Sequence, residues 1–146
     1  MAEPIKALPL KDEDLTASLH VFGRALLGIV LDPRTLALHR LMVAEGGRFP
    51  ELAHAVYQVG HHRAALILSA FLQRHRERSD AWGSNLPSLA LAQQFISLVV
   101  AEPQLRSLIG LDALPVPTEE TSRIVDGAVW LFLNGLLPER GGAPHA

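Results

Sequence analysis

Seven histidines are the first residues of this 146-residue sequence that suggest chemistry, because a neutral imidazole is a common metal ligand. Three of them, His54, His61 and His62, fall in one predicted helix, where His54 and His61 share a face. That face carries the polar residues of the helix, so we expect it to meet solvent rather than a metal ion. With no cysteine and no HExxH motif, the sequence predicts no metal site and no other cofactor.

The sequence also lacks the motifs of nucleophilic and nucleotide chemistry, since GxSxG, a P-loop and GxGxxG are all absent. An enzyme is therefore not expected. The formal net charge of −2 gives no basic footprint of the kind with which proteins bind nucleic acid unaided. The uncharged stretch 81–101 is broken up by glycine, proline and amide residues, and no signal peptide is visible. We expect a cytoplasmic protein that makes no contact with a membrane.

Two charges inside an apolar helix are the best candidates for a binding site. On a helical wheel, Arg40 and Glu45 both point towards apolar neighbours in the predicted helix 33–45. Because buried charges need partners, either each pairs with a neighbouring helix, which we favour, or both line a ligand cavity. Pockets between bundle helices are a common place for a small molecule. The side chains expected beside them in such a cavity are His39, Tyr57 and Trp82.

The elements that must position these residues are all predicted helices. Turn and capping signals such as Asp32-Pro33 and Gly46-Gly47 divide the chain into an all-α bundle of about five or six helices. The predicted helices cover about 12–30, 33–45, 50–78, 88–101 and 118–137, with a short piece at 104–109. We expect an N-terminal extension at 1–11, one domain at 12–137 and a disordered tail at 138–146.

Two breaks and one buried face are expected within these helices. Gly60 is expected to kink or divide the third helix, and Glu102-Pro103 to end the fourth. The basic run Arg74–Arg78 closes the third helix and is expected to be solvated. The apolar face of the third helix is predicted to contain Leu52, Val56, Val59, Ile67, Ala70 and Phe71.

The fourth and last predicted helices are apolar over most of their circumference, and such a helix must be covered on every side. A domain this small has little mass to cover two of them, so we predict a two-fold homodimer with a four-helix interface. A monomer with a large core is the alternative. The candidate interface residues are Leu91, Phe95, Leu98, Val99, Gly127, Ala128, Leu131, Phe132 and Gly135.

Three stretches in order resemble the C-terminal regulatory domain of TetR-family transcriptional repressors, in particular its AefR-like branch. They are LHRLMVAEGGRFPELAHAVYQVG, LALAQQFISLVVAEPQLRSLIGL and TEETSRIVDGAVWLFLNGL, and the resemblance covers about 15–137. The resemblance implies an all-helical domain that dimerises through its last two long helices and holds a small, usually apolar or aromatic effector. The family also carries an N-terminal helix-turn-helix head, and only about a dozen residues precede the first matching helix here.

The resemblance therefore implies an effector-sensing and dimerisation domain that does not contact nucleic acid by itself. The alternative is a stand-alone carrier, or an enzyme without a recognisable motif, that uses the same cavity. The sequence does not specify the effector or the genes it would control.

Overall fold

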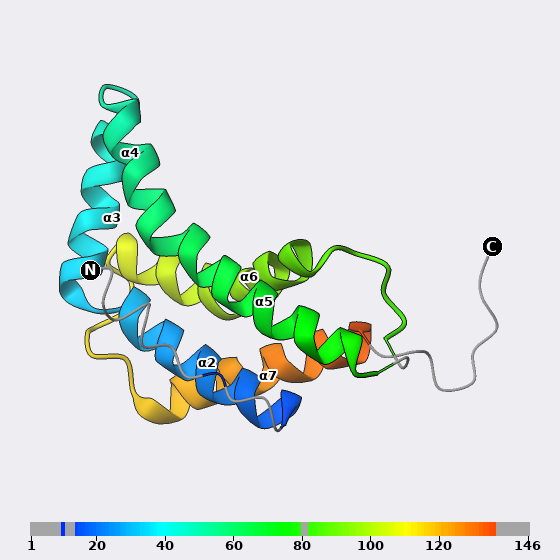
Figure 1. Cartoon of the computed structure of the whole chain (residues 1–146). Coiled ribbons are helices and arrows are strands. Elements are labelled where there is room, and N and C mark those ends of the chain that lie inside the picture. Colours follow the sequence, from blue (N-terminus) through cyan, green and yellow to red (C-terminus); the bar gives the residue numbers. More distant parts are fainter. Residues whose placement is uncertain (1–9, 11–13, 80–81, 137–146) are drawn as a thin grey trace, which may run out of the picture.

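Six α-helices and one π-helical turn form the part of the chain that the computed structural model describes, residue 10 and residues 14–79 and 82–136. Figure 1 shows α2 and α7 side by side, α5 crossing α6, and α3 with α4 projecting as a hairpin. No strand occurs among these residues, so the all-α bundle is confirmed. The elements are α2 (Leu15–Val30), α3 (Pro33–Glu45), α4 (Pro50–Tyr57), η1 (Gln58–His62), α5 (Arg63–Glu77), α6 (Ser88–Leu108) and α7 (Thr118–Leu136).

Capping side chains fix where the first two described helices begin. The carboxylate of Asp14 accepts hydrogen bonds from the backbone N–H groups of Thr16 and Ala17, at 3.0 and 3.3 Å. Asp32 accepts one from the N–H of Arg34 at 2.9 Å, and a proline follows it in the first turn. These bonds satisfy N–H groups that have no partner inside the helix. The first helix therefore starts at Leu15, three residues later than the sequence suggests.

Gly60 does not divide the third predicted helix, because a π-helical turn, η1, joins α4 to α5. Such a turn places one extra residue in the helix, and one residue corresponds to about 100° of rotation. The apolar face predicted from a regular wheel is partly correct: beyond the turn Phe71 is buried and Ile67 packs against the core, but Ala70 is exposed. Leu52 and Val59 are exposed, whereas α5 buries Ala64, Ala65, Leu68, Phe71 and Leu72.

Pro103 does not end α6, which continues for five more residues to Leu108. A proline removes one N–H donor from the helical ladder, and a helix survives this loss when its flanking turns are well packed. Val99, Val100, Pro103 and Ser107 are all buried around the interruption. The expected separate piece at 104–109 is therefore the last part of α6.

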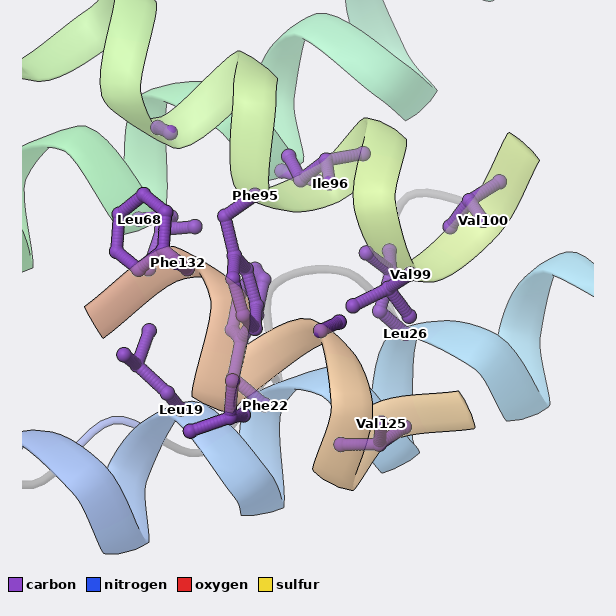
Figure 2. Close-up of a cluster of buried hydrophobic side chains, with 14 of the residues drawn as sticks. Leu19, Phe22, Leu26, Leu68, Phe95, Ile96, Val99, Val100, Val125 and Phe132 are labelled. Atoms are coloured by element: carbon purple, nitrogen blue, oxygen red, sulfur yellow. The ribbon is translucent and has the colours of Figure 1, made fainter. Parts of the chain in front are cut away.

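Side chains from four helices meet in the core (Figure 2). Phe95 of α6 is fully buried, and its ring lies 6.4 Å from Phe22 of α2 and 5.2 Å from Phe132 of α7. Leu68 of α5 belongs to the same buried cluster. Because α6 contacts α2, α3, α5 and α7, it is the central helix of the bundle.

The expected disordered tail at 138–146 lies outside the described residues, as does the expected extension at 1–11 except for Leu10. Within the described part, no single helix is both long and apolar enough to cross a membrane. The pair α2 and α3, bent by 66° at their junction, meets that test only when its two helices are counted together.

Candidate functional site

A cavity of about 1050 Å³ lies between α2, α3, the α4–η1–α5 rod and α6. Four residues of α6 reach it at regular four-residue steps: Ile96, Val100, Gln104 and Leu108. Pockets for drug-sized ligands usually have volumes of about 300–1000 Å³ and mostly apolar walls. The apolar lining from the other helices includes Ala25, Leu26, Ile29, Val30, Leu38, Met42, Val56 and Ala64.

Few polar groups face this cavity, and most of them are paired. Gln104 Nε2 lies 2.9 Å from His39 Nδ1, a contact that joins α6 to α3. Asp32 and Arg34 form an ion pair at 3.5 Å on the opposite part of the lining. The ring of Tyr57, at the end of α4, stacks on that of His61 in the π turn with a centroid distance of 5.6 Å. The two rings form the aromatic part of the cavity lining.

The two histidines of the lining favour their neutral forms. Burial lowers the pKa of His39, and the neighbouring charge of His61 lowers it further. Partial desolvation and the charge of His62 lower the pKa of His61 in the same way. Neutral imidazoles preserve the largely apolar character of the cavity.

Acidification is expected to destabilise the domain through these histidines. A lowered folded-state pKa gives stability that is complete above the unfolded value of about 6.5 and is lost as the pH falls through the folded pKa. The urea midpoint should therefore decrease between pH 7.5 and 5.0, and the decrease should be smaller in His39→Gln. The pKa of Asp112 is also lowered, by its hydrogen bond to Arg106, but its usual value is 3.8, so it contributes below this window. If the urea midpoint decreases equally in His39→Gln and in the parent chain, His39 does not contribute to the pH dependence. The control is His54→Gln, at an exposed histidine, which should show the same decrease as the parent chain.

The structure separates the five predicted cavity residues into two groups. His39 and Tyr57 line the cavity, whereas Arg40, Glu45 and Trp82 have partners elsewhere. Arg40 donates hydrogen bonds to the carbonyl oxygens of Ser107, at 2.8 Å, and Leu108, at 3.1 Å. Glu45 pairs with Arg48 at 3.3 Å across the turn that follows α3. Arg40 therefore has the partner on a neighbouring helix that we favoured from the sequence, whereas the partner of Glu45 is local.

Arg40 is expected to stabilise the domain by capping the end of α6. A cation at the C-terminus of a helix satisfies free carbonyl groups and opposes the negative end of the helix dipole. Arg40→Met should lower the free energy of unfolding by about 1–2 kcal/mol in urea titrations. Arg63→Met, which removes an exposed arginine from α5, should change it by less than about 0.5 kcal/mol. Equal losses in the two variants would show that Arg40 is not a cap.

Trp82 lies against Arg76, which is in the last turn of α5. The Arg76 guanidinium is 5.2 Å from the centroid of the Trp82 ring, and it donates a hydrogen bond to the carbonyl oxygen of Leu86 at 2.7 Å. Arg76 also reaches the oxygens of Ser84 and Ser88. The expectation that this basic residue is solvated is therefore wrong, because it holds the loop that leads into α6.

The nine predicted interface residues also fall into two groups. Packing within one chain already buries five of them, which cannot reach a partner: Leu91, Phe95, Val99, Ala128 and Phe132. The other four are exposed: Leu98, Gly127, Leu131 and Gly135. Two large apolar side chains that the sequence analysis did not include extend this surface, Leu105 on α6 and Trp130 on α7. We call the exposed set Leu98, Leu105, Gly127, Trp130, Leu131 and Gly135 the α6–α7 surface.

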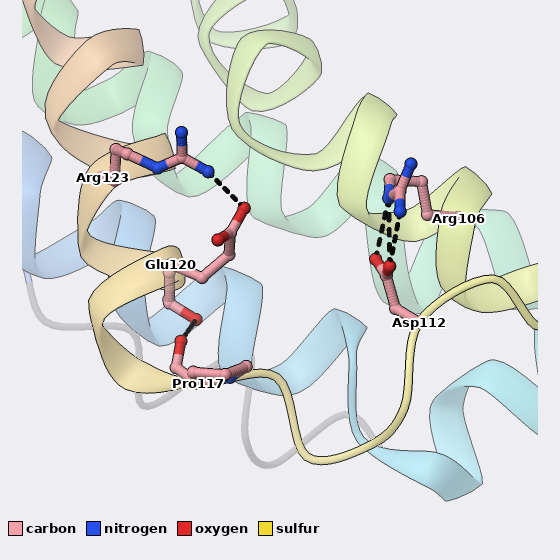
Figure 3. A network of polar contacts seen from close by, with 6 residues as sticks. Arg106, Asp112, Pro117, Glu120 and Arg123 are labelled. Atoms are coloured by element: carbon pink, nitrogen blue, oxygen red, sulfur yellow. Dashed lines mark hydrogen bonds and ion pairs between the residues drawn. The ribbon is translucent and has the colours of Figure 1, made fainter.

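A second hollow, of about 710 Å³, borders this surface between α6 and the start of α7. Its lining includes two ion pairs, which Figure 3 shows: Arg106 with Asp112, at 2.8 Å, and Arg123 with Glu120. Leu98, Gly127 and Leu131 line the same hollow. The α6–α7 surface therefore has apolar residues beside a paired, charged rim, as protein interfaces often do.

Metal coordination has no geometric support in residues 14–79 and 82–136. No three histidine or acidic side chains come together there in a way that would hold an ion. His61 and His62 instead stack on Tyr57, with centroid distances of 5.6 and 5.7 Å.

Residues 17–135 match the family model of the AefR-like transcriptional repressor C-terminal domain. The chain belongs to this family. No curated protein matches the sequence. Two solved structures are similar to this AefR-like domain. One, from Mesorhizobium loti MAFF303099, is described as a TetR-family transcriptional regulator; it has a TM-score of 0.77 and 22% identity, over 94% of this chain and 66% of that one. The other is the flavonoid-responsive regulator FrrA, with a TM-score of 0.76 and 26% identity, over 96% of this chain and 72% of that one.

Five polar residues of the cavity lining in this AefR-like domain were missed by sequence reasoning: Asp32, Arg34, Thr35, His61 and Gln104. Gln104 is the one of them that pairs with a predicted cavity residue, His39. It follows Ile96 and Val100 at four-residue steps, a signal that is visible only if the helix continues through Pro103. Its partner His39 lies 65 residues earlier in the sequence, and the pattern of neither helix indicates the contact.

Proposed function

We propose that this chain senses a small effector in the cavity between α2 and α6 and forms a homodimer through the α6–α7 surface, as the regulatory domain of a TetR-type repressor. The cavity carries the first part of this proposal, because it is large, mostly apolar and lined by four separate helices. In this role the domain acts in the cytoplasm and has no catalytic residue.

The homodimer is supported by the α6–α7 surface. Leu98, Leu105, Trp130 and Leu131 are between 44% and 64% exposed, although they lie on two helices whose other faces are buried in the core. Large apolar side chains gathered on neighbouring helices are typical of a surface that a partner covers. In a two-fold dimer the same surface of each chain would meet its copy in a four-helix interface.

A thermal-shift screen of apolar and aromatic compounds tests the effector role. A ligand that binds only the native state stabilises it by about 2.7 kcal/mol at 100 times its Kd, so the unfolding temperature should rise with concentration. Flavonoids are a reasonable first class to include, because the related FrrA is a flavonoid-responsive regulator. The filled-cavity variant Ala64→Trp should lose the shift. A shift that Ala64→Trp retains would place the ligand outside this cavity.

Operator DNA should not be bound by this domain alone. The family match is to a C-terminal domain, and the formal net charge of −2 provides little attraction for phosphates. A mobility-shift titration at low salt should therefore show no sequence-specific complex. A specific complex that weakens steeply with added salt would contradict this part of the proposal.

A further inference from the structure

The charged groups of the cavity lining leave no net charge for a ligand to neutralise. Asp32 and Arg34 pair with each other at 3.5 Å. His39 and His61 favour their neutral forms, since burial lowers the pKa of both rings. No other aspartate, glutamate, lysine or arginine of the described residues lines this cavity. An ionised ligand buried here would lose its hydration without gaining a counter-charge, which is costly.

The His39–Gln104 pair keeps both donor hydrogens and an acceptor for a ligand, because only one N–H of the Gln104 amide is used between the two side chains. Gln104 Nε2 always carries hydrogens, so at 2.9 Å it donates to Nδ1 of His39, and the ring proton is then on Nε2. The Nε2–H of His39 and the Oε1 of Gln104 have no hydrogen-bond partner among residues 14–79 and 82–136. Turning the amide by 180° makes Nε2 of His39 the unused acceptor and the amide N–H groups of Gln104 the unused donors, so both kinds of group remain.

A hydroxyl group is the simplest chemical complement of such a pair, because it donates one hydrogen bond and accepts others. A carbonyl or ether oxygen satisfies only the donor, and a carboxylate adds a charge. Building on the proposed function, we propose that the effector is an uncharged, largely apolar molecule whose hydroxyl group is bound by His39 and Gln104. The aliphatic wall around Ile96 and Val100 holds the apolar body of the ligand.

Three probes of the same ring size test this inference by calorimetry at pH 7.5: 2-naphthol, its methyl ether 2-methoxynaphthalene and the anion 2-naphthoate. We expect 2-naphthol to bind about tenfold more tightly than the ether, the equivalent of one good hydrogen bond. The anion should bind more weakly than either. Each ratio compares ligands of similar apolar area, so it isolates the polar contribution.

Two variants test whether the pair is responsible for this preference. Gln104→Met keeps the length and apolar stem of the side chain, and His39→Leu removes the other partner independently. In each, 2-naphthol and the ether should bind with affinities within about twofold of each other, while the affinity for the ether is retained. Gln93→Met, on the same helix but outside the cavity lining, should keep the tenfold preference.

The outcomes separate this inference from the proposed function. If the three probes bind the parent chain equally, or the preference for 2-naphthol survives in both variants, the hydroxyl assignment is wrong but the cavity still binds ligands. Tighter binding of 2-naphthoate would also overturn the assignment. If neither these probes nor any compound of the thermal-shift screen binds, the proposed effector role fails, and the inference fails with it.

Discussion

Replacing Leu98 and Leu131 together by aspartate should convert the proposed homodimer into a monomer. These side chains are 44% and 55% exposed on α6 and α7, and we place both in the dimer interface. Each chain would then bring two carboxylates into the interface, four in all, and the nearby Arg106 and Arg123 already pair with Asp112 and Glu120. At about 1 kcal/mol or more for each unsatisfied group, the dimer Kd should rise roughly a thousandfold. Sedimentation equilibrium over a range of concentrations measures this change.

Leu66→Asp is the matched control for this experiment. Leu66 is 48% exposed on α5, so the substitution introduces the same charge at a similarly exposed helical position outside the α6–α7 surface. It should leave the mass of the dimer unchanged. A parent chain that already sediments as a monomer of 15.9 kDa would contradict the proposed homodimer directly.

Phe95→Ala should destabilise the fold more than any other single truncation discussed above. The ring is fully buried and packs between Phe22 and Phe132, so its removal leaves a cavity that four helices border. Comparable truncations cost about 3–5 kcal/mol, out of a total of roughly 5–15 kcal/mol for a domain. We expect a large decrease in the urea midpoint with an unchanged m-value.

Phe49→Ala provides the same chemical change at an exposed site. Phe49 is 50% exposed before α4, and the Arg48 guanidinium lies 5.5 Å from its ring centroid. Its truncation should cost less than about 1 kcal/mol. The comparison requires equal protein concentrations, because dimerisation contributes to apparent stability. A loss in Phe95→Ala as small as in Phe49→Ala would mean that the core adjusts around the missing ring.

The helices could be predicted from the sequence because their signals are local. Asp32-Pro33 is a capping residue followed by a proline, and it marks the start of α3 correctly. Pro103 misled the prediction of α6, since the packing that lets a helix continue through a proline involves residues far apart in the sequence. The π turn had the same effect on α5, because a wheel assumes a constant rotation per residue.

The binding surfaces could be predicted only in part. When a helix is apolar on every side, its sequence does not show which side faces the core of its own chain. Phe95 and Leu98 were therefore both predicted in the interface, although only Leu98 is exposed. Tyr57 and Trp82 were predicted together as neighbours of Arg40 and Glu45, but only Tyr57 lines the cavity. The position of Trp82 depends on its contact with Arg76, which no periodic pattern encodes.

Adjacent residues of α3 are both tied to the end of α6: His39 to Gln104, and Arg40 to Ser107 and Leu108. The same helix presents Leu98 and Leu105 on the α6–α7 surface. A ligand that binds Gln104 therefore contacts the helix that, in the proposed homodimer, also meets the partner chain. Such coupling is reciprocal, because the free energy by which a ligand shifts dimerisation equals that by which dimerisation shifts ligand affinity. The apparent affinity for an effector should accordingly depend on the concentration of the protein itself.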